Sequence, residues 1–219
     1  MRITAVAWDI DGTLVDSEPL HHQALLEASA TFNVDLGDLP PLAFRGVHME
    51  DVWTRLRGRF PAALTRSEWL DGIENRYIAG AGRLRALAGA RQAIQRLALA
   101  RIPQVCVSNS SRRIVDANLA TLELLPYLQF SISLNDVANG KPHPEPYATA
   151  ARRLGIEPQH LLAVEDSESG LASASAAGLC TAAIGSDCAD HADWLIDLPT
   201  EVVDIVLSPA RSRPDQAHR

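Results

Sequence analysis

The sequence predicts an α/β fold, a doubly wound parallel sheet with an inserted α-helical domain. Short apolar runs alternate with helical patterns along most of the chain, as in proteins whose parallel sheet is covered by helices on both faces. Between residues 18 and 83 the alternation stops, and helical patterns follow one another without a convincing strand. A chain of 219 residues is long enough for one or two domains.

Apolar runs of strand length predict the sheet, in chain order: Ile3–Trp8, Val105–Val107, Phe130–Leu134, Leu161–Val164 and Cys180–Ile184. Apolar stripes at helical spacing predict the helices between them, over residues 90–100, 112–125, 146–154 and 169–177. Gly155 and Gly178 stand where helix C-caps are expected. Pro103, Pro126 and Pro158 mark boundaries of the same units.

The inserted segment carries helical patterns over residues 21–32, 50–59 and 67–79. Its joints are Asp16–Pro19 and the glycine-rich stretch 79–89, either of which can flex. We therefore expect a core domain formed by residues 1–16 and 86–208, a helical domain over 17–85, and a flexible tail over 209–219.

Composition limits the class of protein. A hydrophobic content of 47% with 21% charged residues is ordinary for a globular protein, and no apolar run approaches a membrane span. The net charge of −7 argues against a nucleic-acid or anionic-membrane partner, whose binding surface would be basic. The three cysteines lack metal-ligand spacing and the N-terminus does not resemble a secretion signal, so we expect a cytoplasmic protein.

Two aspartates follow directly on the first apolar run. Asp9 and Asp11 stand at the end of the predicted strand, and Gly12 allows a sharp turn. Because alternate residues of a strand share a face, the two carboxylates repel each other unless a cation lies between them. The cation that suits all-oxygen ligands is Mg²⁺. Two other interpretations are a plain strand end and a calcium loop, although Leu20 stands where that loop needs Glu.

Polar patches follow two later strands. Ser108 and Asn109 come between an apolar run and a helix, where a hydroxyl and free backbone N–H groups can seat a phosphate or simply cap the helix. Lys141 lies in a proline-rich loop and is the single lysine beside nineteen arginines. Either Lys141 occupies a position that requires a compact ammonium, or it is a chance exception to the preference of this chain for arginine.

Glu165 and Asp166 end another buried strand. Two adjacent acids there cost free energy unless something positive faces them, although solvated acids also favour the start of the next helix. Open α/β sheets place their sites at the carboxyl ends of strands, so we expect all four patches to meet at one edge of the sheet.

Together the four patches resemble the motifs of the haloacid dehalogenase superfamily, in the β-phosphoglucomutase-like subgroup of phosphatases with a helical cap. The resemblance covers residues 3 to about 185 and implies a Rossmann-like core. The matching motifs are Asp9-Ile-Asp-Gly-Thr-Leu-Val-Asp, Ser108-Asn, Lys141-Pro and Glu165-Asp-Ser. Gly46 in Phe-Arg-Gly-Val is similar to the subgroup's cap loop for substrate recognition.

The resemblance also implies roles. Asp9 would attack phosphorus and form an aspartyl-phosphate, while Asp11 would protonate the leaving oxygen and then activate water. Mg²⁺ would be held by the Asp9 side chain, the Asp11 carbonyl and Asp166, with Glu165 as a direct ligand or a holder of a metal-bound water. The groups implied to grip the substrate phosphate are Ser108, the Asn109 amide and Lys141.

The resemblance leads us to expect a Mg²⁺-dependent phosphatase for a small phosphorylated metabolite, a sugar or sugar-acid phosphate, acting as a monomer or weak dimer. Asp11 argues against C–Cl cleavage, and the lack of a lysine in the cap argues against a phosphonatase. One alternative is a sugar phosphomutase, which His21 favours and Met49 disfavours. Arg45 matches a basic cap-loop position and is a further candidate substrate contact. Another alternative is a non-catalytic module that binds a phosphorylated ligand.

Overall fold

The computed structural model describes residues 2–40, 43–44, 49–185 and 192–208. Its sheet consists of β1 Ala5–Trp8, β2 Gln104–Val107, β3 Phe130–Ile132, β4 Leu161–Glu165, β5 Cys180–Ile184 and β6 Trp194–Ile196. Its α-helices are α1 Glu18–Ala30, α2 Met49–Leu56, α3 Arg66–Gly80, α4 Ala90–Leu99, α5 Arg112–Thr121, α6 Glu145–Leu154, α7 Glu168–Ala176 and α8 Glu201–Leu207. Its 3₁₀ helices are η1 Arg57–Arg59, η2 Ala81–Arg83, η3 Leu125–Tyr127, η4 Leu134–Asp136 and η5 Pro158–His160.

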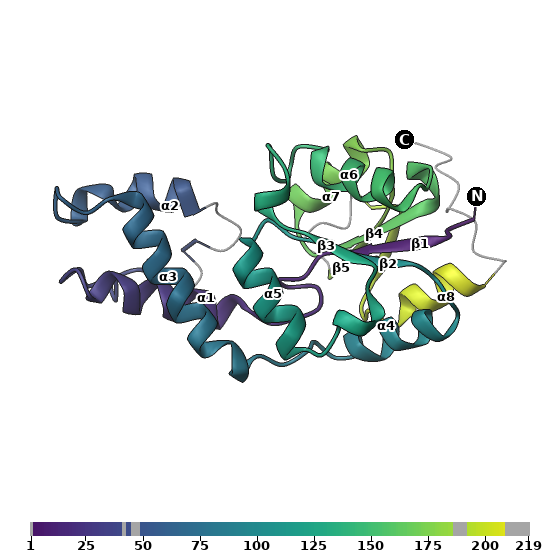
Figure 1. Ribbon diagram of the computed structural model, residues 1–219, viewed down its shortest axis with the longest axis horizontal. Coiled ribbons are helices and arrows are strands. Elements are labelled where there is room, and N and C mark those ends of the chain that lie inside the picture. The colour runs from purple at the N-terminus through teal and green to yellow at the C-terminus, as the bar shows by residue number, and fades with distance from the viewer. Residues whose placement is uncertain (1, 41–42, 45–48, 186–191, 209–219) are drawn as a thin grey trace. The chain divides into compact units, whose positions relative to one another are not determined.

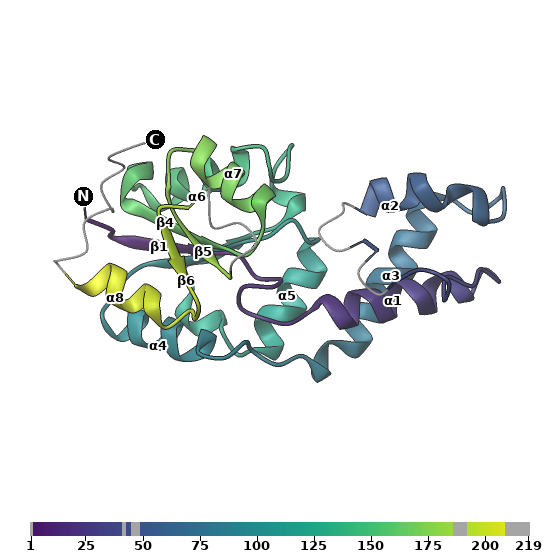
Figure 2. The same cartoon turned by 180° about the vertical axis from the view of Figure 1, so that it is seen from behind.

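All pairs of neighbouring strands run parallel, in the order β3-β2-β1-β4-β5-β6. Helices α6 and α7 cover one face of the sheet and α4 and α8 cover the other (Figures 1 and 2). The predicted doubly wound parallel sheet is thus confirmed. The strand order reverses at β1, whose neighbours are β2 and β4, and ligands of such sheets bind beyond the carboxyl ends of the strands at this reversal.

The chain divides into two compact units, which we call the core unit (Met1–Asp16 with Arg85–Arg219) and the helical unit (Ser17–Leu84). The core unit contains the whole sheet, and its central strands β1, β2 and β4 are buried along their entire length. Continuous apolar strands of this kind are expected where both faces of a parallel sheet are covered.

The helical unit is built on the packing of α1 against α3. Helix α3 begins at a capping box, in which the Thr65 side chain accepts from the Glu68 backbone N–H and the Glu68 side chain accepts from Thr65. Trp69 of α3 is fully buried, and its indole N–H donates to Ser29 Oγ of α1 at 3.2 Å. Among the described residues of this unit there is no strand, as predicted.

The structure corrects several predicted boundaries and adds two elements. The strand expected over 130–134 ends at Ile132, because Ser133 and Asp136 form a capping box that starts η4. The helix expected over 112–125 ends at Thr121, ahead of η3 with Pro126. Strand β6 and helix α8 were not predicted from the sequence. Within the described part of the chain, no helix has the length and apolarity needed to cross a membrane.

Candidate active site

The polar patches predicted from the sequence meet in the core unit at the carboxyl ends of three adjacent strands. Asp9 follows β1, Ser108 follows β2, and Glu165 is the last residue of β4. Since β1 lies between β2 and β4, these residues stand side by side at the reversal of strand order. Lys141 reaches them from the loop that precedes α6.

Lys141 is the centre of a buried ionic cluster. Its Nζ donates to Asp9 Oδ1 at 2.7 Å, to Glu165 Oε1 at 2.5 Å and to the Val107 carbonyl oxygen at 2.8 Å. An ammonium has three N–H donors, and these acceptors use all of them. Burial alone would lower the pKa of Lys141, but Asp9 and Glu165 outweigh burial and hold it above its usual value. Lys141 therefore stays charged, in a place that suits a compact cation.

Glu165 has no exposed surface and accepts further hydrogen bonds. Tyr147 Oη donates to Oε1 at 2.5 Å, and Ser167 Oγ donates to Oε2 at 3.1 Å. Burial and the Glu165 charge raise the pKa of Tyr147 well above its usual value, so the phenol remains a donor. A Cβ at Gly170 would lie 2.0 Å from Glu165 Cδ, so only glycine allows α7 to approach this carboxylate.

Asp9 is buried, and its two oxygens differ. Oδ1 accepts from Lys141, whereas Oδ2 has no hydrogen-bond partner among the residues that the structure describes. Burial raises the pKa of Asp9, Lys141 lowers it, and the neighbouring carboxylates raise it, for a net increase. An unpartnered buried carboxylate oxygen needs a cation or a reaction partner.

Asp9, Glu165 and Asp166 each offer an oxygen, and these oxygens lie within 4.8 Å of one another. The carboxylates outnumber the one nearby ammonium, so a divalent cation would balance the charge. The all-oxygen donor set fits Mg²⁺. Gly12 allows the close approach of the loop after β1, because its φ is +88° and a Cβ there would lie 2.0 Å from Asp166 Oδ2.

Ser108 and Asn109 do not cap α5, since that role belongs to Ser111, whose hydroxyl accepts from the Ile114 N–H. The Asn109 side chain holds the backbone of Lys141: Nδ2 donates to the Lys141 carbonyl at 3.0 Å, and Oδ1 accepts from the Lys141 N–H at 2.8 Å. The loop after β2 therefore fixes the lysine that approaches β1.

The Asp11 carboxylate is held by the same loop and by α5. Oδ2 accepts from Ser110 Oγ at 2.8 Å and from Ser108 Oγ at 3.3 Å, while Oδ1 accepts from Asn118 Nδ2 at 3.1 Å. Sequence reasoning missed Ser110, Asn118 and Tyr147. The signal for the last two was a polar group on the otherwise apolar stripe of a helix, which packing alone does not explain.

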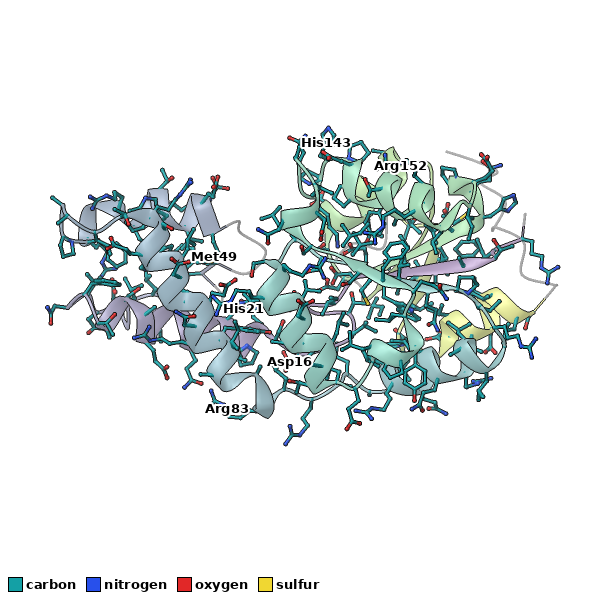
Figure 3. All side chains as sticks on the ribbon, viewed as in Figure 1. Asp16, His21, Met49, Arg83, His143 and Arg152 are labelled. Carbon is teal, nitrogen blue, oxygen red and sulfur yellow. The ribbon has the colours of Figure 1, made fainter. Side chains whose placement is uncertain are left out.

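Within the helical unit, the ring of His21 of α1 packs against that of Tyr77 of α3, with ring centroids 4.2 Å apart and planes tilted by 32°. Met49 is the first residue of α2, and Figure 3 labels both His21 and Met49. The His21 ring therefore packs against the partner helix of its own unit. Arg45 and Gly46, predicted as substrate contacts, lie outside the described residues.

Comparison with known proteins identifies the family. The family model of the haloacid dehalogenase-like hydrolases matches residues 3–178. Hexitol phosphatase A of Escherichia coli strain K12 is 30% identical over 85% of this chain and 85% of its own. The phosphorylated carbohydrates phosphatase of Thermotoga maritima is 27% identical over 80% of this chain and 82% of its own.

The crystal structure of CbbY from Rhodobacter sphaeroides in complex with phosphate has a TM-score of 0.78 and 25% identity. The match covers 91% of this chain and 96% of CbbY. These similarities confirm the predicted enzyme class, a phosphoric monoester hydrolase, and its resemblance to the β-phosphoglucomutase-like subgroup. The family match spans far more than half of the chain, so the chain belongs to the haloacid dehalogenase-like hydrolases.

Proposed function

We propose that this enzyme is a Mg²⁺-dependent phosphatase that hydrolyses a small phosphorylated metabolite through an aspartyl-phosphate on Asp9. The observation that carries the proposal is the asymmetry of the Asp9 carboxylate. Lys141 holds Oδ1, and Oδ2 is buried without a hydrogen-bond partner among the described residues. A carboxylate oxygen that is fixed, desolvated and unpartnered is suited to attack an electrophile.

In this mechanism Asp9 attacks phosphorus, and the bond from phosphorus to the leaving oxygen breaks. The Asp11 carboxyl gives its proton to that oxygen and then takes a proton from the water that hydrolyses the aspartyl-phosphate. The Ser108 hydroxyl and the Asn109 backbone N–H bind the oxygens of the transferring group, and the Lys141 ammonium, whose three N–H groups already have acceptors, attracts these oxygens through its charge. Lys141 thus has two tasks, since it also fixes the nucleophile.

The cation would be held by the Asp9 side chain, the Asp11 carbonyl and Asp166. When bound, Mg²⁺ neutralises the charge that develops on the phosphoryl oxygens. Glu165 already accepts from Lys141, Tyr147 and Ser167, so we assign it to orienting Lys141 and to the outer shell of the metal.

The names of the relatives support a sugar phosphate or sugar-acid phosphate as substrate, because two of them are a hexitol phosphatase and a phosphatase of phosphorylated carbohydrates. We also propose a cytoplasmic setting, since Cys106 is a buried free thiol.

The test is a panel of phosphorylated sugars, sugar acids and p-nitrophenyl phosphate, assayed with and without Mg²⁺ for free phosphate and for isomerised sugar phosphate. We expect Mg²⁺-dependent phosphate release, abolished by EDTA and by Asp9→Asn. Turnover that survives EDTA, or wild-type turnover by pure Asp9→Asn, would overturn the mechanism. Isomerisation in excess of hydrolysis would identify a phosphomutase, and tight binding without turnover would identify a binding module.

A further inference from the structure

Asn118 is an unexpected residue for its position in the fold. It lies on the buried face of α5 beside Ile114, Val115 and Leu119, and it has no exposed surface. Asparagine is a poor residue for a helix interior, and a buried amide costs free energy unless it is hydrogen-bonded. Packing of α5 would be served as well by leucine, so the amide requires another explanation.

The partner of this amide is the carboxylate to which the proposed function assigns proton transfer. Asn118 Nδ2 donates to Asp11 Oδ1 at 3.1 Å, across 107 positions of the chain. The other oxygen, Oδ2, accepts hydrogen bonds from Ser110 Oγ at 2.8 Å and from Ser108 Oγ at 3.3 Å. The carboxyl group is therefore held at both oxygens, by groups of different chemistry.

The difference between these groups matters for a proton. An amide NH₂ only donates, so the oxygen that faces it must act as an acceptor. A serine hydroxyl can donate or accept, so it accommodates either a carboxylate oxygen or a carboxylic O–H. Because Oδ1 accepts from the Asn118 amide, we expect a neutral Asp11 to carry its proton on Oδ2.

We propose that Asn118 is a positioning residue that orients Asp11 and directs its proton to Oδ2 for transfer to the leaving group. This inference rests on the proposed function, because it assumes that Asp11 is the general acid. It adds that α5, outside the recognised motifs, determines how readily the enzyme cleaves esters of poorly acidic alcohols.

Leaving-group dependence tests the inference. Nitrophenolate departs readily without a proton, whereas phenolate and above all a sugar alkoxide need one. We would compare kcat/KM for p-nitrophenyl phosphate, phenyl phosphate and the sugar phosphate on which the wild type is most active. This parameter includes steps only up to the first irreversible one, transfer of the phosphoryl group to Asp9.

The test variant is Asn118→Leu, which keeps the branched shape of the side chain, replaces its polar atoms with methyl groups and suits a helix. Asn118→Ala serves as a second variant should the leucine protein fail to fold. We expect the loss of kcat/KM to grow along the series, and to be at least about tenfold larger for the sugar phosphate than for p-nitrophenyl phosphate, about 1.4 kcal/mol. Val115→Ala is the matched control, since it disturbs the same buried face of α5 without removing a hydrogen bond, and any loss there should be equal for all substrates.

Equal losses for the three substrates in the Asn118 variants would assign Asn118 a structural role and overturn the inference, as would unchanged kinetics. Failure of the proposed function looks different, because the wild type would then lack Mg²⁺-dependent turnover or Asp9→Asn would retain it. That result would show that both the proposed mechanism and the inference about Asn118 are wrong.

Discussion

The Lys141 ammonium nitrogen lies 2.7 Å from Asp9 Oδ1, in a pair whose side chains are only 3% and 9% exposed. Burying two charges costs several kcal/mol per ion before their attraction is counted, so such a pair is weak evidence for a purely stabilising role. Here the same ammonium also contacts Glu165, which is fully buried. The proposed function explains the arrangement as a charged site held ready for a doubly negative phosphoryl group.

Replacement of Lys141 by arginine tests whether this site needs a compact cation. Three acceptors surround one nitrogen, and a planar guanidinium cannot meet them from a single point. We expect Lys141→Arg to lower kcat for p-nitrophenyl phosphate by more than about tenfold, or about 1.4 kcal/mol. The reverse exchange at an exposed position of α4, Arg96→Lys, is the control and should leave kcat unchanged. Wild-type kcat in Lys141→Arg would mean that the lysine is incidental.

Replacement of Tyr147 tests whether its hydroxyl holds the Glu165 carboxylate in place. Tyr147→Phe removes the hydroxyl that donates to Glu165 Oε1 and keeps the ring, so Lys141 becomes the principal donor to that oxygen. We expect the free energy of unfolding to fall by about 1.5–3 kcal/mol, as for loss of a hydrogen bond to a charged group. We also expect kcat to fall several-fold, because Glu165 orients Lys141. Tyr127→Phe is the control, since the Tyr127 hydroxyl accepts from Gln95 away from the site. Equal effects of the two variants in urea unfolding and in kcat would show that the Tyr147 hydroxyl has no specific role in holding Glu165.

Replacement of Gly170 tests whether the site requires the close approach of α7 to the Glu165 carboxylate. Gly170→Ala places a Cβ within 2.0 Å of the buried Glu165 carboxylate, which then has to leave Lys141. We expect more than about a tenfold loss of kcat and a stability loss of about 1–3 kcal/mol, the usual cost of overpacking. Gly58→Ala meets no atom within 4 Å and should change stability by less than about 0.5 kcal/mol. Full activity of Gly170→Ala would show that Glu165 can move without consequence.

Asp136 predicts a pH dependence of stability outside the site. Burial raises its pKa, but hydrogen bonds from Ser133 and Arg112 outweigh burial, so the pKa lies below its usual value. A lowered folded-state pKa stabilises the fold fully above the unfolded value, about 3.9, and the benefit disappears as the pH falls through the folded value. Because the side chain is 34% exposed, we expect Asp136→Asn to lower the free energy of unfolding at neutral pH by only about 1 kcal/mol.

That deficit should shrink as the pH is lowered below about 4, which urea unfolding across a pH series would measure. Asp116→Asn is a matched control, since Asp116 pairs with the same Arg112 but is 60% exposed, and it should cost less than about 0.5 kcal/mol. A deficit for Asp136→Asn that stays constant with pH would contradict the pKa assigned to Asp136.

Most of the fold was predictable because the central strands are buried on both faces and therefore appear as continuous apolar runs. Strand β6 was not, because Trp194–Ile196 is too short for a pattern to stand out and its middle residue, Leu195, is exposed. Helix α8 was missed as well, since the short segment from Val202 to Val206, four β-branched apolar residues around Asp204, does not distinguish a helix from a strand.

The meeting of Asp9, Ser108 and Glu165 was predictable from topology, because the carboxyl ends of parallel strands share one edge of the sheet. Asn118 and Tyr147 were not, because they act from helices, and which helical residues face a site depends on how the helices pack on the sheet. A polar side chain at a core position of an amphipathic helix was the one signal in the sequence.

The most direct test of the central claim is to quench wild-type enzyme in acid during turnover of p-nitrophenyl phosphate with Mg²⁺ and to map its peptides by mass spectrometry. The account predicts one phosphoryl group on Asp9, removable by hydroxylamine and absent from Asp9→Asn. Rapid turnover with the phosphoryl group on another residue would contradict the account. So would the absence of any phosphoryl group from the enzyme when nitrophenolate is released faster than phosphate.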